Sequence, residues 1–242
     1  MRKTILTYIF LIFANSLFGQ DSKKATYNFN EFNSLVLKGG IKREYAVKQF
    51  DSLINTVNHL AFIRSQIDPV IGPNWVFPLQ GYNSKAIGGY NGNGYQDKGY
   101  HYLDGNKHLA HPAHDIFIRD KNQDCLDDKT NLPVNVLAIE NGMVVACTND
   151  WDSKSNLRGG KYIWIYHPSE HFFTYYAHNG TIFVRPYQWV KQGQKIAEVG
   201  RTGYNAYKKR SPTHLHFSAF KLVDGLPVPF NPYKQLTKAI TQ

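Results

Sequence analysis

Two histidines one residue apart stand near the end of the chain, in the apolar run His214-Leu215-His216-Phe217. Side chains at positions i and i+2 point to the same face of a β-strand. If this run is a strand, both imidazoles project together while Leu215 and Phe217 pack behind the sheet. Such a pair could bind a metal ion or form a catalytic dyad, and it requires a further partner.

A candidate partner lies upstream, in the run His111-Pro112-Ala113-His114-Asp115. The proline favours extended backbone at the residue before it. Residues i and i+4 share a face of an extended chain, so His111 and Asp115 should converge while His114 points elsewhere. These two side chains and one histidine of the downstream pair make three ligands. A catalytic zinc site uses three protein ligands and leaves the fourth position to water.

Short strands and tight turns should position these residues. After residue 75 almost no helical periodicity remains, and glycine-containing turns separate apolar runs. Turns are expected at Gly142, Gly159-Gly160, Asn179-Gly180, Gly193 and Gly200. The runs that fit a strand template are 116–118, 134–138, 142–146, 162–166, 173–177, 181–184 and 195–199. The pattern predicts an all-β fold, an antiparallel barrel or sandwich.

The N-terminal part of the chain differs from the rest. A polar segment from residue 21 leads into an amphipathic pattern over 41–67, which predicts a helix that packs against one edge of the main domain. We expect an N-terminal helical extension over 21–74, a main domain over 75–235 and a short tail over 236–242. The long Gly-, Asn- and Tyr-rich stretch 88–105 is expected to form a wall of a substrate groove.

The first residues have the pattern of a secretory signal peptide. Arg2 and Lys3 precede an apolar run over 5–18, and Gly19-Gln20 supplies a cleavage site. We expect cleavage near residue 19–20, a periplasmic or secreted protein, and no stable membrane anchor, because no cysteine for a lipid anchor lies near the cleavage site. Loss of two cations would lower the net charge from +10 to +8. No nucleic-acid-binding motif accompanies this positive charge, which suits an acidic polymer instead.

Six landmarks occur in a fixed order, and with them the chain resembles the lysostaphin/LytM-type zinc endopeptidases, which cut peptide cross-links of bacterial cell walls. The resemblance covers roughly residues 75–235. The landmarks are His-x-x-x-Asp at 111–115, Pro-Val-x-Val-Leu-Ala at 133–138 with Gly142-x-Val144, Tyr-Ala-His at 176–178, Val-x-x-Gly-Gln-x-Ile at 190–196, Gly-Arg-Thr-Gly at 200–203 and His-Leu-His-Phe at 214–217.

The resemblance implies a LytM-type hybrid of barrel and sandwich, and a role for each residue of the site. His111, Asp115 and His216 would hold one zinc ion, and His178 and His214 would be the catalytic histidines. Tyr102 could donate a hydrogen bond to the oxyanion, as a loop tyrosine does in relatives, or be a surface aromatic. The substrate would be the stem and cross-link peptides of peptidoglycan. We expect a monomer.

The chain departs from the family pattern at two segments. Residues 120–132, which carry Cys125, look like an insertion, and 204–211 replace a shorter link before His214. We expect both segments near the groove. Lys208, Lys209 and Arg210 favour a D-alanyl–diaminopimelate link over a glycine bridge as substrate. Cys125 and Cys147 could form a disulfide or remain free thiols.

Two alternatives to an active endopeptidase compete. A catalytically silent regulator or wall-binding module of this type normally lacks one or more of the ligands, and none is missing here. A D-alanyl carboxypeptidase would be expected to carry Glu-x-x-His, whereas Glu170 is followed at once by His171. The remaining histidines are expected to have no metal role; they are His59, His101, His108, His167 and His171.

Overall fold

The structure is a computed structural model, and it describes residues 28–69, 72, 74–107 and 109–242. The expected signal peptide and its cleavage site lie outside these residues. Among the residues described, no helix has both the length and the apolar character needed to cross a membrane.

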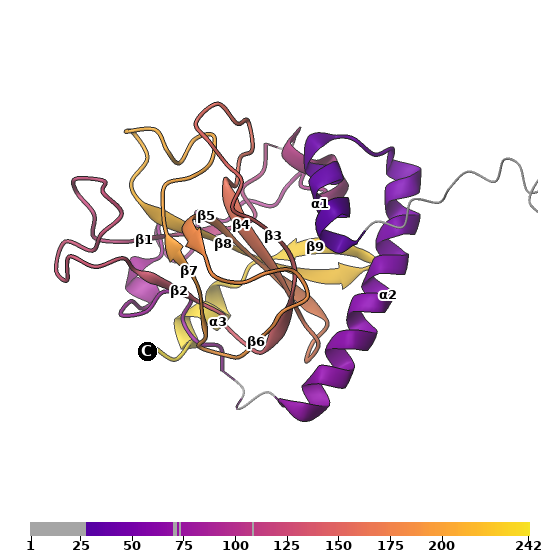
Figure 1. The fold of residues 1–242 in the computed structure, drawn as a ribbon. Coiled ribbons are helices and arrows are strands. Elements are labelled where there is room, and N and C mark those ends of the chain that lie inside the picture. Colours follow the sequence, from indigo (N-terminus) through magenta and orange to yellow (C-terminus); the bar gives the residue numbers. More distant parts are fainter. Residues whose placement is uncertain (1–27, 70–71, 73, 108) are drawn as a thin grey trace, which may run out of the picture.

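One nine-stranded antiparallel sheet forms the main body of the molecule (Figure 1), which confirms the predicted antiparallel all-β class. Six strands follow one another in the order β1-β8-β5-β4-β3-β6. Strand β7 pairs with β2 and β5, and β9 pairs with β8. The strands are β1 (His114–Phe117), β2 (Asn135–Leu137), β3 (Gly142–Thr148), β4 (Lys161–His167), β5 (Phe172–Ile182), β6 (Trp189–Val190), β7 (Lys195–Val199), β8 (His214–Val223) and β9 (Leu226–Phe230).

Both faces of the sheet are buried over much of their area. In β4, Ile163 and Ile165 belong to one hydrophobic core, whereas Trp164 and Tyr166 belong to a second core on the opposite face. The first core lies against β2, β7 and the segment that enters the domain at Phe77. The second core is rich in aromatic side chains and is covered by the N-terminal helices. Strand alternation therefore creates two apolar faces, and each needs a cover.

The N-terminal extension consists of two helices, α1 (Phe29–Lys38) and α2 (Arg43–Ile67), which stand on one side of the sheet in Figure 1. Helix α2 confirms the helix predicted over 41–67. Both helices bury their apolar residues in the second core and so cover a face of the sheet, and not an edge as expected. The aromatic side chains of β4 explain the difference, because they make this face too apolar to be left in water.

Helix α1 was not predicted, although the sequence contains its signals. The Asn28 side chain accepts a hydrogen bond from the Glu31 amide, and the Glu31 side chain accepts one from the Asn28 amide. This reciprocal pair is a capping box, and Gly39 ends the helix in the left-handed conformation at φ 67°. Phe29, Phe32 and Val36 form its buried side together with Asn33.

The expected turn at Asn179-Gly180 does not exist. Both residues lie within β5, and the register of β5 shifts between Asn179 and Ile182 where it pairs with β7. The irregularity starts at His178, whose φ is 65°. A bulge therefore takes the place of the turn, and it redirects the His178 side chain.

Three short helical segments complete the described fold. They are η1 (Ser84–Ala86), η2 (Tyr102–Lys107) and α3 (Tyr233–Lys238). Leu236 of α3 is buried in the first core. Residues 236–242 return to the start of the main domain, because the Ile240 amide donates to the Trp75 carbonyl and the Phe77 amide to the Ile240 carbonyl. Cys125 and Cys147 are both free thiols.

Candidate active site

Strands β1 and β8 bring the two halves of the predicted site together. They pair antiparallel, with Asp115 directly opposite His216. Leu215 and Phe217 are fully buried in the first core, so His214 and His216 project from the opposite face of β8. This is the arrangement that the alternating pattern of the sequence predicts.

His111, Asp115 and His216 form a group whose ligand atoms lie within 4.8 Å of one another and could hold a metal ion. Asp115 Oδ1 is 3.2 Å from His111 Nε2 and 3.2 Å from His216 Nδ1. His111 Nδ1 donates to the Gly94 carbonyl at 3.1 Å, and Nε2 on the other side of the ring faces Asp115. Metal-ligating histidines commonly carry such a second hydrogen bond, since it fixes the ring and its tautomer.

The electrostatics of this group depend on the Asp115 carboxylate. Burial opposes its ionisation, but hydrogen bonds from His111 and His216 outweigh burial and hold the pKa of Asp115 well below its usual value. The hydrogen bond to Asp115 is the largest influence on His111, and it raises the pKa of that imidazole. Burial lowers the pKa of His216, despite its contact with the same carboxylate. A carboxylate and neutral imidazoles are the forms that bind zinc.

His178 and His214 stand beside this group, with their ring centroids 4.9 Å apart. His178 Nδ1 donates to the Thr202 carbonyl at 2.8 Å, and His214 Nδ1 donates to the Pro212 carbonyl at 2.7 Å. Each ring therefore keeps Nε2 free to accept a proton. His214 Nε2 lies 3.6 Å from Asp115 Oδ1. Burial, together with the neighbouring imidazoles, holds the pKa of His178 well below its usual value, so this ring is neutral near pH 7.

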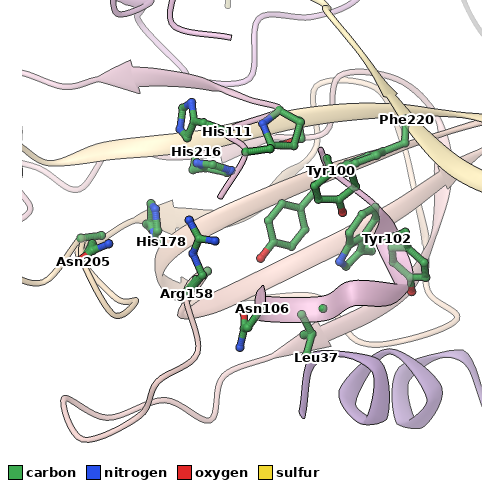
Figure 2. A pocket seen from close by; sticks show the side chains of 18 of the residues that line it. Leu37, Tyr100, Tyr102, Asn106, His111, Arg158, His178, Asn205, His216 and Phe220 are labelled. Atoms are coloured by element: carbon green, nitrogen blue, oxygen red, sulfur yellow. The ribbon is translucent and has the colours of Figure 1, made fainter. Parts of the chain in front are cut away.

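A cavity of about 260 Å³ extends from the five residues along the same face of the sheet. Figure 2 shows the histidines at one end and Tyr100, Tyr102 and Phe220 at the other. Segment 88–105 contributes wall residues, as predicted, and so does segment 204–211 through Asn205, Ala206 and Ser211. Segment 120–132 supplies no residue to this cavity or to the larger one next to it. It lies instead against 204–211, where Gln123 Nε2 donates to the Lys209 carbonyl at 3.0 Å.

Tyr102 lies at the aromatic end of the cavity, and its side chain is buried. Its hydroxyl donates to Asn33 Oδ1 of α1 at 2.9 Å, and its ring packs edge-on against Trp164 and Phe50. Burial raises its pKa well above 10. The hydroxyl therefore joins segment η2 to helix α1, and it would have to leave Asn33 in order to reach a substrate oxyanion.

The other described histidines lie apart from the metal-capable group. His114 packs between the rings of Tyr95 and Tyr233, and its Nε2 is 2.8 Å from Asn231 Oδ1. His167 is fully buried in the sheet, whereas His59, His101 and His171 are exposed. His108 lies outside the described residues. These positions agree with the expectation that His111, and not His114, faces Asp115.

Two contributions to the cavity were not foreseen from the sequence. Asn33, Val36 and Leu37 of α1 line it, so the N-terminal extension forms part of the site. Arg158, which precedes the expected turn at Gly159-Gly160, lines it as well. The sequence contains a capping box at the start of α1 and a glycine pair after Arg158, which indicate a helix and a turn. Neither motif predicts which part of the sheet its segment approaches.

Residues 123–230 match Peptidase family M23. This part of the chain is similar to that family. The match confirms the lysostaphin/LytM-type resemblance, and it includes His178, His214 and His216. His111 and Asp115 precede the matched residues, so their assignment rests on the geometry of the site.

Curated relatives of this chain include the murein hydrolase activators NlpD of Escherichia coli (strain K12) and Salmonella dublin. Each is 42% identical over 83 residues, or 34% of this chain. The chain spans only 18% and 19% of the length of these two proteins. Among solved structures, the catalytic domain of the antimicrobial peptidase lysostaphin from Staphylococcus simulans is 24% identical with a TM-score of 0.42, over 63% of this chain and 94% of that chain. A zinc-containing peptidase from Vibrio cholerae is 25% identical with a TM-score of 0.39, over 70% and 41%.

Proposed function

We propose that this protein is an exported zinc-dependent endopeptidase that hydrolyses the peptide cross-links of bacterial peptidoglycan. The observation that carries the proposal is the convergence of three metal-capable side chains with two histidines that each present a free Nε2. The M23 family relationship supports peptide hydrolysis as the reaction. Export by a signal peptide, a positive surface and a monomeric state remain parts of the proposal that follow from the sequence.

His111, Asp115 and His216 are the proposed zinc ligands. Two imidazoles and one carboxylate are a donor set that zinc accepts in catalytic sites, and the three side chains already converge. Zinc held there would polarise the scissile carbonyl and acidify the attacking water. Asp115 carries the negative charge that such a site needs, because its pKa is held low.

His214 and His178 are the proposed proton-transfer groups. His214 Nε2 lies next to Asp115, so this ring is placed to take a proton from the attacking water. His178 lies next to His214 and His216, and once its Nε2 has taken up a proton it could donate a hydrogen bond to the developing oxyanion or that proton to the leaving amine. The carbonyl partners of the two rings hold both nitrogens in place for these roles.

Stimulation of another murein hydrolase is a second candidate function, because the curated relatives are named as activators. Such a role needs a docking surface and no proton transfer. The two candidates therefore differ in their dependence on His214.

The test is mass spectrometry of purified cross-linked muropeptide dimers after incubation with the zinc-loaded protein and with its His214→Ala variant. We expect the wild type to convert dimers to monomers. The variant should retain zinc and lose about 10²–10⁴-fold in rate, since its proposed role is proton transfer and not ligation.

Three results would contradict this assignment. Dimers that stay intact while pentaglycine is cut would move the substrate to glycine bridges. Loss of a single terminal residue would indicate a carboxypeptidase. Dimers that stay intact while both proteins accelerate a second murein hydrolase would indicate an activator.

A further inference from the structure

Arg158 is the one lysine or arginine among the described residues that line the cavity of the site. Figure 2 shows it between His178 and the aromatic end. It also lines the neighbouring cavity of about 1040 Å³, so it stands where the two cavities meet. The side chain is half-buried.

The backbone that carries Arg158 is fixed against the proposed catalytic histidine. The His178 amide donates to the Gly159 carbonyl at 2.9 Å, and the Tyr204 amide donates to the Leu157 carbonyl at 3.1 Å. The Gly159 backbone also packs so closely on the Tyr175 hydroxyl that a Cβ at this position would collide with it. These contacts fix the backbone on both sides of Arg158 relative to His178, which is what a substrate-binding group needs.

The surroundings of Arg158 favour an ionic partner. The aromatic end of the cavity exposes few polar groups, and it is formed by Tyr100, Tyr102, Trp164 and Phe220 with Val36 and Leu37 of α1. Burial raises the pKa of Tyr175 well above 10, and the positive charge of Arg158 acts against this shift. In a cavity of low polarity an ion pair is stronger than in water, and a guanidinium pairs with a carboxylate through two parallel hydrogen bonds.

We propose that Arg158 is a specificity-determining residue that binds a carboxylate of the substrate peptide close to the scissile bond. The inference rests on the proposed peptidase function and narrows it to peptides with a free carboxylate beside the bond that is cut. Small apolar groups of the substrate that lie next to this carboxylate would face the aromatic end of the cavity.

The three cations expected from the sequence to do this lie elsewhere. Lys208 Nζ sits over the Tyr204 ring at 4.3 Å from its centroid, and an Arg210 guanidinium nitrogen lies 3.2 Å from Asn205 Oδ1. Neither these two residues nor Lys209 line the two cavities. Segment 204–211 thus contributes no cation to either cavity, whereas Arg158 lines both.

The experiment pairs a change in the protein with a change in the substrate. The probes are cross-linked muropeptide dimers with all carboxylates free, with the diaminopimelate carboxylate converted to an amide, or with the terminal D-alanine carboxylate converted to an amide. Binding to zinc-loaded His214→Ala protein, with and without Arg158→Gln, is measured by calorimetry, and kcat/KM is measured in the wild-type background.

We expect Arg158→Gln to weaken binding of the free-carboxylate dimer by about 10-fold to 100-fold. One of the two amidated dimers should bind to the protein with Arg158 more weakly than the free-carboxylate dimer does, by the same factor. Its binding should then not change further on Arg158→Gln. Arg158→Lys keeps the charge without the two-pronged geometry and should give an intermediate loss. Lys154→Gln, in the same loop but exposed and lining only the larger cavity, should change binding less than about 2-fold.

Equal losses on free and amidated dimers would overturn the proposal, because Arg158 would then act on something other than the carboxylate. His214→Ala protein with Arg158 intact that binds all three dimers equally would also overturn it, even if the Arg158 variants failed to fold. Absence of cleavage with carboxylate-dependent binding intact would instead count against the peptidase assignment alone.

Discussion

At the scale of single residues, hydrogen bonds to backbone carbonyls determine what each imidazole of the site can do. In three of the rings Nδ1 donates a hydrogen bond to a backbone carbonyl: His111 to Gly94, His214 to Pro212 and His178 to Thr202. The neutral rings of His214 and His178 therefore keep Nε2 unprotonated, whereas His111 directs Nε2 at Asp115. His216 differs, because its Nδ1 is the atom near Asp115. The tautomers follow from fixed main-chain geometry, so the site is organised before a metal ion binds.

His216→Ala should abolish tight zinc binding, because two remaining ligands make too weak a site. Elemental analysis of purified protein should give one zinc per chain for the wild type and little for the variant. His59→Ala, which removes an exposed histidine on α2, is the matched control and should keep its zinc. Equal zinc content in all three proteins would remove His216 from the ligand set.

At the scale of elements, helix α1 joins the N-terminal extension to the site. Buried Asn33 donates from Nδ2 to the Tyr162 hydroxyl at 2.9 Å and accepts from the Tyr102 hydroxyl. The Gly105 backbone of η2 packs so closely on the Val36 carbonyl that a Cβ there would collide with it. Helix, 3₁₀ segment and sheet thus form one wall of the cavity, and this wall depends on a polar side chain in an apolar core.

Asn33→Ala should lower the free energy of unfolding by about 1–3 kcal/mol, because it leaves two buried tyrosine hydroxyls without this partner. Urea unfolding of the zinc-free protein measures the change. Ser34→Ala, at the next and more exposed position of the same helix, should change it by less than about 0.5 kcal/mol. Similar values for the two variants would show that the Asn33 bonds contribute little to stability.

At the scale of the whole molecule, burial of both faces of the sheet forces some polar groups into the interior. His167 at the end of β4 is fully buried, with Nδ1 donating to the Asn141 carbonyl at 3.0 Å and Nε2 accepting from the Thr174 hydroxyl at 2.7 Å. Burial lowers its pKa to about 4, although the Asn141 bond acts in the opposite direction. The folded protein therefore holds this ring neutral under conditions in which the unfolded chain would protonate it.

This linkage predicts a loss of stability in acid. The unfolded chain binds the proton at a pKa of 6.5 and the folded protein only at about 4, so stability is complete above pH 6.5 and falls as the pH drops towards 4. The contribution of His167 is about 3 kcal/mol over this range. Urea unfolding of zinc-free protein at pH 7.5 and pH 4 should show a smaller difference for His167→Gln than for the wild type. His59→Gln, at an exposed position, should keep the full difference, and equal differences in all three proteins would exclude His167 as the cause.

Local patterns in the sequence were enough to predict the centre of the site. The side chains of His214 and His216 share a face because a strand has a period of two. His111 and Asp115 meet as their spacing predicts, although β1 begins only at His114. The amphipathic helix over 41–67 is equally local, because its apolar spacing lies within one segment. Each of these features depends on residues a few positions apart, so no knowledge of the rest of the chain was needed.

Other features of the site depend on contacts between distant segments, and only the tertiary structure decided them. Arg158 lies beside His178 because main-chain hydrogen bonds tie Leu157 and Gly159 to β5 and to segment 204–211. Asn179-Gly180 continues a strand because β7 pairs with it, although the same dipeptide alone favours a turn. Helix α1 reaches the cavity because the aromatic face of β4 requires a cover. In each case the local sequence permits several conformations, and the free energy of pairing and burial against remote segments selects one of them.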